Sequence, residues 1–475
     1  MKLFEAYAEE IEELIRTGAL RQGDRLPSVR QASAGRRISP STVFRAYYLL
    51  EARARVVARP RSGYFVAPPK VNDALVSETS LLSLPSTATT EVKISELMYE
   101  ILGSVRRRKV VPLGSAFPSP HLFPLERLSR SLSAGMRRLD PARIVEDLSP
   151  GNESLRRQIG LRYMLDGMSV ETGEIVITNG ALEALNLCLE AVTVPGDVVA
   201  IESPTFYAAL QVLERLGLKA VEVATHPRDG VDLASLESVL DRHPVRACWF
   251  MPNFQNPLGS LMPEANKRAL VKLLSARDIP LIEDDVYGEL YFTTRKPRPA
   301  KSFDTRGLVM HCGSFSKSMA PGYRVGWTAA GQFAQRVERL KLETSISAAV
   351  PSQAGISHYL SNGGYDKHLR ALRKALADQQ AAVIESIVKH FPKGTRVTRP
   401  EGGYFLWLEL PNNVDAMRLH QLALLKNISI APGHIFSADH RFTNCVRLNC
   451  GHPLDAQCEA AIRTLGDIAE RLARG

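Results

Sequence analysis

Residues 311–327 read HCGSFSKSMAPGYRVGW, an apolar start that predicts a strand, followed by Lys317 among small hydroxyl residues. A lysine becomes a nucleophile when burial or a neighbouring cation lowers its pKa, and Arg324 follows in the same segment. Ser314, Ser316 and Arg324 would also form a phosphate-binding cup. Lysine beside a phosphate cup indicates pyridoxal 5'-phosphate, although the motif alone is more often a loop with a solvated lysine.

Three segments before this lysine supply further groups for a phosphorylated pyridine ring. TNGALEAL predicts a helix whose first N–H groups, at Gly180 and Ala181, can hold a phosphate. SPTFY places Phe206 after a strand, where an aromatic side chain can stack on the ring. PNFQNPLG offers Asn256 as a hydrogen-bond partner for the phenolic oxygen of the ring.

Two more segments supply charged groups. IEDDVYGEL ends an apolar strand with carboxylates and places Tyr287 nearby. A buried carboxylate there would hold the pyridine nitrogen protonated, which keeps the ring an electron sink. NCVRLNC places Arg447 among apolar residues, where it could clamp a carboxylate. Each residue alone has an ordinary explanation as core, turn, cap or ion pair, but six such segments in one chain favour a cofactor site.

The segments around these residues alternate short apolar runs with helical stretches. EIVITNG, DVVAIESP, ACWFMPN, IPLIEDD and LVMHCGSFS read as buried parallel strands, which predicts an α/β fold. Each run ends in polar residues, and open α/β sheets bind ligands beyond the carboxyl ends of their strands.

The N-terminal part of the chain is more basic than the rest. Residues 1–70 hold thirteen Lys/Arg and seven Asp/Glu, a balance of +6 within a total of +10 over 475 residues. No acidic residue stands between Arg25 and Leu50. A basic surface usually meets an anionic partner, and double-stranded DNA is the first candidate.

The patterns in this region predict three helices and a hairpin. Residues 41–51 are the candidate recognition helix, with Ser41 and Thr42 at its start and Arg45 one turn later. Arg59 and Arg61 flank the hairpin turn, where they could enter a minor groove. Arginines on the outside of a small bundle are the alternative explanation.

The predicted domains are residues 1–67 for DNA binding, 68–95 as a flexible linker and 96–475 for the cofactor. The linker is rich in Ser, Thr, Pro and Ala and has no aromatic residue. The acidic N-terminus does not resemble a signal peptide, no apolar run is long enough to cross a membrane and there is no C-x-x-C pair, so we expect a cytoplasmic protein without a metal site.

The order PSVR, SPSTVFRAY, RPRSGYFV resembles the GntR family of winged helix-turn-helix regulators over about residues 3–66. The resemblance implies that the DNA contacts come from Ser28, Arg30, Ser41, Thr42, Arg45 and Gly63.

Over about residues 110–470 the chain resembles fold-type I pyridoxal phosphate enzymes of the aspartate aminotransferase family. The resemblance implies a mostly parallel large domain with a smaller α/β domain, and a Schiff base on Lys317. It implies that Asp284, rather than Asp285, pairs with the pyridine nitrogen, and that Phe206, rather than Tyr207, stacks on the ring. The remaining implied roles are phenolic-oxygen binding by Tyr287 and Asn256, substrate carboxylate binding by Arg447, and phosphate binding by Gly180, Ala181, Ser314, Ser316 and Arg324.

One departure concerns a tyrosine that many relatives carry near residues 146–150 and that reaches the phosphate of the neighbouring subunit. Here the stretch reads IVEDLSPGNESLRRQ and has none. We therefore expect phosphate affinity or the dimer site to differ from those relatives.

A GntR-like unit joined to an aminotransferase-like body resembles the MocR subfamily, as do SAFPSPHLFP (115–124) and NCGHP (449–453). The resemblance implies a homodimeric, domain-swapped transcription regulator that senses pyridoxal phosphate, an amino acid or an amine through aldimine chemistry. Two alternatives stay open: a working aminotransferase acting on an α-amino acid, and a DNA-binding protein whose body only dimerises.

Overall fold

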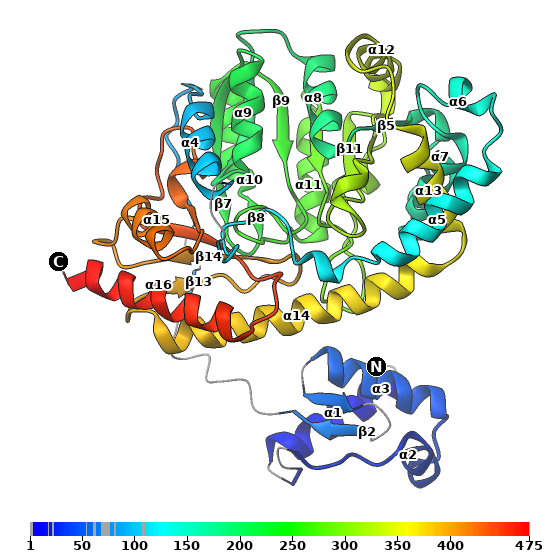
Figure 1. Ribbon diagram of the computed structural model, residues 1–475, viewed down its shortest axis with the longest axis vertical. Coiled ribbons are helices and arrows are strands. Elements are labelled where there is room, and N and C mark those ends of the chain that lie inside the picture. The colour runs from blue at the N-terminus through cyan, green and yellow to red at the C-terminus, as the bar shows by residue number, and fades with distance from the viewer. Residues whose placement is uncertain are drawn as a thin grey trace. The chain divides into compact units, whose positions relative to one another are not determined.

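The computed structural model describes residues 3–17, 19–20, 23–53, 55–59, 63–67, 77–79, 82–106 and 110–474. The chain forms two compact units, a small one within residues 1–75 and a body that takes up most of the rest. The two are considered separately (Figure 1).

The small unit has the predicted order of three helices and an antiparallel hairpin: α1 Leu3–Arg16, α2 Val29–Arg36, α3 Pro40–Ala52, β1 Val56–Arg59 and β2 Gly63–Val66. Apolar side chains at helical spacing meet in one core, in which Val43, Tyr47 and Leu50 of α3 are fully buried. The hydroxyl of Tyr47 donates to the carbonyl of Pro27 at 2.8 Å, which ties α3 to the segment before α2.

Serine caps fix where α2 and α3 begin. Ser28 and Gln31 form a reciprocal capping box at the start of α2. Ser39 accepts the N–H of Thr42 at 3.1 Å, and Pro40 follows as the first residue of α3. The turn between the two helices starts at Arg37, which has a left-handed φ of 53° where glycine is usual.

The body is built on a nine-stranded mixed sheet, which confirms the predicted α/β class. Its order is β4-β7-β6-β9-β10-β11-β12-β5, with β8 beside β7; β7, β6, β9, β10 and β11 are parallel neighbours, and β12 is antiparallel to both β11 and β5. The strands are β4 Thr90–Glu91, β5 Ile175–Thr178, β6 Val198–Ser203, β7 Lys219–His226, β8 Gly230–Val231, β9 Val245–Phe250, β10 Leu281–Asp284, β11 Val309–Ser314 and β12 Gly326–Ala329.

Helices cover both faces of this sheet (Figure 1). Alternate residues of β6 enter different cores, Val199 and Ile201 on one face and Val198 and Ala200 on the other. The helices of the body up to α13 are α4 Ser95–Arg106, α5 Leu125–Arg138, α6 Arg143–Glu146, α7 Glu153–Leu165, α8 Ala181–Val192, α9 Tyr207–Arg215, α10 Leu233–Arg242, α11 Glu264–Ser275, α12 Ala334–Thr344 and α13 Val350–Ser361.

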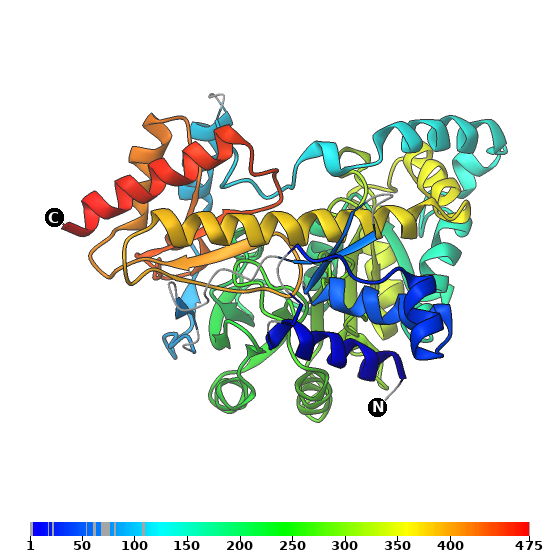
Figure 2. The same ribbon diagram turned by 90° about the horizontal axis from the view of Figure 1, so that it is seen from below.

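The C-terminal part adds a five-stranded sheet in the order β15-β16-β14-β13-β3. The long helix α14 lies beside α16 next to this sheet (Figures 1 and 2). The elements are β3 Ser77–Glu78, α14 Gly364–His390, β13 Arg396–Val397, β14 Phe405–Glu409, α15 Ala416–Leu425, β15 Ala431–Pro432, β16 Cys445–Asn449 and α16 Ala456–Arg474.

The segment predicted as a flexible linker differs from that expectation over residues 77–79 and 82–95. β3 pairs with β13 at the edge of the five-stranded sheet, and β4 pairs with β7 at the edge of the nine-stranded sheet. Short edge strands are held by backbone hydrogen bonds, so a segment without an apolar period can still join a sheet. We call residues 77–79 and 82–91 the strap, because they fasten to both sheets.

None of the helices in the described part of the chain is long and apolar enough to span a lipid bilayer. The same described residues contain no group of His, Cys, Asp and Glu side chains arranged to hold a metal ion.

Candidate functional site

The carboxyl ends of the parallel strands meet at one edge of the nine-stranded sheet and enclose a cavity of about 280 Å³. Because parallel strands end on the same side, segments far apart in the sequence converge there. The predicted cofactor residues that line this cavity are Ala181, Phe206, Asp284, Tyr287, Ser314, Ser316, Lys317 and Arg324.

Lys317 follows β11 and extends its amine into this cavity. Its Nζ donates to the carbonyl of Ala116 at 2.9 Å and lies 3.9 Å from the centroid of the Phe117 ring. Burial lowers the pKa of Lys317 to about 7, Arg447 and Arg324 push in the same direction, and Asp284 opposes them. The amine is therefore largely neutral just above neutral pH, as a nucleophile must be.

Asp284 is the last residue of β10 and faces the cavity, whereas Asp285 faces the other side of the sheet. The Oδ1 atom of Asp284 is buried without a hydrogen-bond partner among the described residues. Burial raises the pKa of Asp284 to about 7; Asp285 adds to this rise, while the N–H of Val286 and the amine of Lys317 oppose it. An unsatisfied buried carboxyl oxygen costs free energy unless a ligand supplies a donor.

At the other end of the cavity, the start of α8 meets Arg324. Gly180 caps α8 with φ 86°, and no side chain caps the first N–H groups of that helix. Arg324 donates to the carbonyl of Asn179 at 2.9 Å and to Ser316 Oγ at 3.3 Å, and Ser314 bonds Ser316 at 3.0 Å. A Cβ on residue 180 would lie 2.3 Å from Arg324 Nη2, so only glycine leaves room for the guanidinium. Free helical N–H groups beside two hydroxyls and an arginine form an anion cradle.

Arg447, Asn256 and Tyr287 form a connected group beside this cavity. Arg447 lies in β16 and is fully buried; its Nη1 donates to Asn256 Oδ1 at 3.0 Å. The amide of Asn256 is 3.5 Å from the hydroxyl of Tyr287, which is long for a hydrogen bond. The Nε of Arg447 has no partner among the described residues.

Two aromatic residues lie at the N-terminus of α9. Phe206 and Tyr207 both line the cavity, with ring centroids 4.8 Å apart. The Tyr207 ring is also 5.9 Å from the guanidinium carbon of Arg447. Phe206 is therefore available for stacking, and Tyr207 stands closer to the expected carboxylate clamp.

The sequence motifs missed the part played by residues 114–117. Their backbone carbonyls accept hydrogen bonds from the charged side chains of the site. Arg447 Nη2 donates to Gly114 O at 2.9 Å, and Lys317 Nζ donates to Ala116 O. The hydroxyl of Tyr404 also donates to Ala116 O, at 3.0 Å. Contacts made by backbone groups of residues so far apart in the sequence leave no sequence motif. The similarity of SAFPSPHLFP (115–124) to a segment of the MocR subfamily was the one sign that this stretch matters.

The predicted DNA contacts are spread over one unit. Ser28, Arg30, Ser41, Arg45 and Gly63 are exposed, and Thr42 is half-buried. Ser41 and Thr42 both hydrogen bond Ser39 Oγ, at 2.9 and 2.7 Å. The side chain of Arg59 and all of Arg61 lie outside the described residues.

The model of the family "Aminotransferase class I and II" matches residues 149–465, and that of "Bacterial regulatory proteins, gntR family" matches residues 3–66. Among curated proteins, the uncharacterized HTH-type transcriptional regulators YdcR and YjiR of Escherichia coli K12 are similar to the chain. YdcR is 45% identical over 99% of this chain and 100% of its own length; YjiR is 36% identical over 99% of both.

Among solved structures, the α-aminoadipate aminotransferase LysN from Thermus thermophilus, complexed with N-(5'-phosphopyridoxyl)-L-leucine, has a TM-score of 0.72 and 28% identity, over 81% of this chain and 96% of its own. Fold and site together define a GntR helix-turn-helix unit joined to a fold-type I aminotransferase body. The chain belongs to the MocR-type family of GntR transcriptional regulators.

Proposed function

We propose that this regulator binds pyridoxal 5'-phosphate in its body and responds there to an amino acid or amine. The observation that carries the proposal is the cavity in which the Lys317 amine, the unsatisfied Asp284 carboxyl and the Arg324 cradle converge. The Lys317 amine can react with the aldehyde of this cofactor, the Asp284 carboxyl can accept a hydrogen bond from its pyridine nitrogen, and the cradle at Arg324 can bind its phosphate.

The residues present fit this cofactor. The open Oδ1 of Asp284 would take the pyridine N–H, and Asn256 with Tyr287 would take the phenolic oxygen. Gly180, Ala181, Ser314, Ser316 and Arg324 would hold the phosphate, and Phe206 would cover the ring. When bound, the group supplies an aldehyde that condenses with amines and a ring that withdraws electrons.

Each of these side chains has a defined task. Lys317 offers a neutral amine because burial and two arginines lower its pKa. Burial raises the pKa of Asp284 to about 7, so its carboxylate would hold a proton at the ring nitrogen of the bound cofactor. Tyr287, buried against Tyr404 and Phe405, excludes water from the phenolic side.

An incoming ligand competes with residues 114–117. Arg447 is a buried cation whose hydrogen-bond partners among the described residues are neutral: Asn256, Tyr207 and the carbonyls of Gly114 and Ser115. A carboxylate would be a stronger partner for the guanidinium than a carbonyl. The effector we favour therefore carries an amine and a carboxylate, and its binding displaces the carbonyls of residues 114–117.

The strap gives this displacement a route toward the DNA-binding unit. The body side of the linker pairs with both sheets, and Arg441, in the loop before β16, bonds Leu84 O as well as Glu222 of β7 at 3.0 Å. A movement of one sheet against the other would pull on the strap. A ligand shifts such an equilibrium only by its differential affinity for the two arrangements.

The remaining parts of the proposal concern organisation. Residues 1–67 bind DNA through Ser28, Arg30, Ser41, Thr42, Arg45, Arg59, Arg61 and Gly63, residues 68–95 connect and residues 96–475 bind the cofactor, all in the cytoplasm where DNA is accessible. A homodimer, with DNA-binding units swapped between bodies, would read repeated half-sites.

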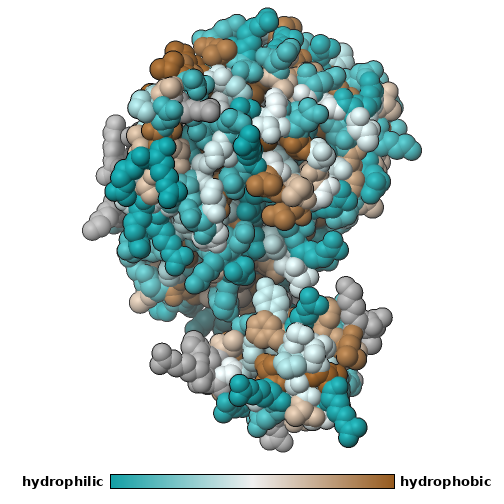
Figure 3. Space-filling view, turned by 90° about the vertical axis from the view of Figure 1, so that its right-hand side faces the viewer, coloured by the Kyte–Doolittle hydropathy of each residue, from teal (hydrophilic) through white to brown (hydrophobic). Residues whose placement is uncertain are grey.

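Exposed apolar side chains support the dimer. Several large ones fall within residues 125–165, on the side of Figure 1 that faces the viewer in Figure 3, where brown side chains appear in separate groups among hydrophilic ones. They are Leu125, Met136, Ile144, Val145, Leu148, Leu161, Met164 and Leu165. Exposed apolar side chains in this number within one stretch of helices are compatible with an interface. Light scattering of the purified protein tests the mass directly.

Transamination is the second candidate function, and a specific observation supports it. Lys317 has a lowered pKa and faces the same cavity as Asp284 and Tyr287, so the chain carries the proton-transfer groups that the reaction needs.

The test is a visible-absorption titration of the cofactor-loaded protein with a panel of amino acids and amines, beside Lys317→Ala. In parallel, the protein is used to select the duplexes that it binds from a random DNA pool, with and without the responding compound. The selected sequence identifies the operator. A stable spectral change with altered DNA affinity supports a sensor. Rapid loss of the visible band, reversed by a 2-oxo acid, supports the enzyme. No visible band in the wild type contradicts the proposal.

A further inference from the structure

Asp284 and Asp285 are adjacent but point to opposite faces of the sheet. Asp284 lines the cofactor cavity, and Asp285 lines a second, smaller cavity of about 40 Å³ behind β10. That volume holds only a few water molecules. The second cavity is therefore too small for an organic ligand, and its side chains act on something else.

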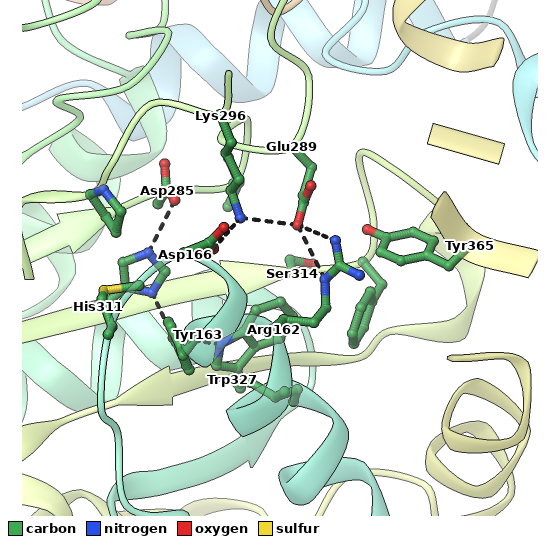
Figure 4. Close-up of a pocket in the computed structure, with 15 residues that line it drawn as sticks. Arg162, Tyr163, Asp166, Asp285, Glu289, Lys296, His311, Ser314, Trp327 and Tyr365 are labelled. Carbon is green, nitrogen blue, oxygen red and sulfur yellow. Dashed lines mark hydrogen bonds and ion pairs between the residues drawn. The ribbon is translucent and has the colours of Figure 1, made fainter. Parts of the chain in front are cut away.

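Asp285 is held by two side chains and by one backbone hydrogen bond, and Figure 4 shows the contact with His311. His311 Nε2 lies 3.0 Å from its Oδ2, and the amide of Asn253 donates to its Oδ1 at 2.9 Å. Its backbone N–H bonds the carbonyl of Cys312, the register partner of Asp284. The side chains of His311 and Asp285 are 5% and 6% exposed. This carboxylate is thus fixed at the strand end, with both oxygens accepting hydrogen bonds.

The hydrogen-bond chain behind His311 defines which ring nitrogen carries the proton. Nε2 faces a carboxylate oxygen, so it must be the donor. Nδ1 lies 2.8 Å from the hydroxyl of Tyr163, which itself accepts the indole N–H of Trp327 at 2.9 Å. With Trp327 donating to its oxygen, Tyr163 directs its own proton to Nδ1. In this arrangement Trp327, Tyr163 and His311 each donate to the next group, and the chain ends at Asp285.

A carboxylate so close to Asp284 acts on it through the strand end. Negative charge in a buried region holds protons on neighbouring groups, and the effect is strong where water is excluded. Other charged groups lie around Asp285. Asp166, Glu289, Lys296 and Arg162 line the same cavity and pair with one another. Outside that cavity, Glu283 on β10 accepts the N–H groups of Ala300 and Lys301, and the buried amine of Lys267 bonds Asn253. Lys296 is 2.6 Å from Asp166 and 3.1 Å from Glu289, so these charges are locally compensated.

We infer that Asp285, oriented by His311 and Asn253, is a positioning residue that fixes the end of β10 and keeps a proton shared between Asp284 and the bound pyridine ring. The inference rests on the proposed cofactor, and it adds a residue that touches neither cofactor nor ligand.

The experiment measures the pH midpoint of the visible absorption of the cofactor-loaded protein. Asp285→Asn removes a negative charge, so protons leave the bound cofactor at lower pH and the midpoint falls by about one pH unit. Asp166→Asn is the matched control: it removes a carboxylate from the same cavity, and it should lower the melting temperature while leaving the midpoint within about 0.2 unit of the wild type.

A second pair of variants guards against misfolding. His311→Gln keeps an N–H near the position of Nε2 and should stay close to the wild-type midpoint, whereas His311→Leu should move it. An unchanged midpoint in Asp285→Asn or in His311→Leu, with the visible band present, overturns the inference. A shift of the same size in Asp166→Asn would also overturn it, because it would reduce the effect to general destabilisation. Absence of the band in the wild type would contradict the proposed cofactor instead.

Discussion

The amine of Lys317 donates a 2.9 Å hydrogen bond to the backbone carbonyl of Ala116, a residue 201 positions earlier in the chain. The same short segment supplies the carbonyls that Arg447 holds. The lysine and the arginine that would grip a cofactor and a carboxylate are thus both bound by residues 114–117. Uptake of either ligand must exchange these bonds, which makes the segment a competitor within the site.

The first prediction concerns the rate at which apoprotein takes up pyridoxal phosphate. Only the neutral amine reacts, and the pKa of Lys317 is lowered to about 7 by burial and by Arg447 and Arg324. The rate should rise with pH, with a midpoint near 7, and level off above it, as stopped-flow absorbance would show. Arg447→Gln removes a cation and should raise the midpoint. A rate still rising in proportion to hydroxide at pH 10 would contradict the lowered pKa.

The second prediction concerns the stability of the apoprotein. The pKa of Asp284 is raised from 3.8 to about 7, so ionising this carboxyl costs more in the folded state than in the unfolded one. Stability should therefore fall as pH rises from 4 to 7. Asp284→Asn should remove this part of the slope and stabilise apoprotein at pH 8 by about 1–3 kcal/mol in urea unfolding.

Glu202 provides the internal reference for that experiment. Burial raises its pKa to about 8, so part of the slope should persist in both proteins. Identical slopes for the wild type and Asp284→Asn would show that Asp284 does not carry the effect. With cofactor present the wild type should be more stable than Asp284→Asn, because the variant has lost the carboxylate that would pair with the ring nitrogen.

The third prediction concerns the anion cradle. Gly180→Ala puts a Cβ 2.3 Å from Arg324 Nη2 at a φ of 86°, so the guanidinium must move. Pyridoxal phosphate affinity should fall by about tenfold or more, equivalent to about 1.4 kcal/mol. Gly160→Ala is the control, because its Cβ meets nothing within 4 Å in α7 and alanine favours a helix. Equal affinities for the two variants would refute the cradle.

The fourth prediction separates two arginines of the DNA-binding unit. Arg45 is exposed on α3, whereas Arg36 pairs with Glu10 of α1. Arg45→Ala should weaken binding to random duplex DNA and reduce the salt slope by about one. Arg36→Ala should change the DNA affinity and the salt slope less, because the charge of Arg36 is already paired with Glu10. The comparison is made by fluorescence anisotropy over a salt series, and equal losses would show that DNA does not approach α3 in the proposed way.

The fifth prediction concerns the strap. Arg441→Ala removes the bonds to Leu84 O and Glu222, so amide exchange over residues 82–91 should accelerate several-fold while cofactor affinity stays within about twofold. Arg474→Ala, which breaks an exposed ion pair with Glu470 on α16, is the control and should leave that exchange unchanged. Unchanged exchange in Arg441→Ala would mean that this side chain does not hold the strap.

The local patterns of the sequence determined the two units and most of the site. A buried strand needs a continuous apolar run and a helix needs capping residues, so β11, α3 and their neighbours could be located from residues alone. Gly180, Ser314, Ser316, Lys317 and Arg324 were predictable because each stands next to such an element. The order of three helices and a hairpin followed from these same local rules, whereas the family came from the resemblance of whole motifs such as SPSTVFRAY and RPRSGYFV to known proteins.

Tertiary structure decided what the period of a strand leaves open. Alternation puts Asp284 and Asp285 on opposite faces, but only packing shows that Asp284 meets the cavity and Asp285 meets His311. Residues 114–117 and the strap act through backbone groups, which every residue type possesses and which therefore leave no pattern in the sequence. Their partners are set by the path of the chain through space, and that path emerges only when the whole body has packed.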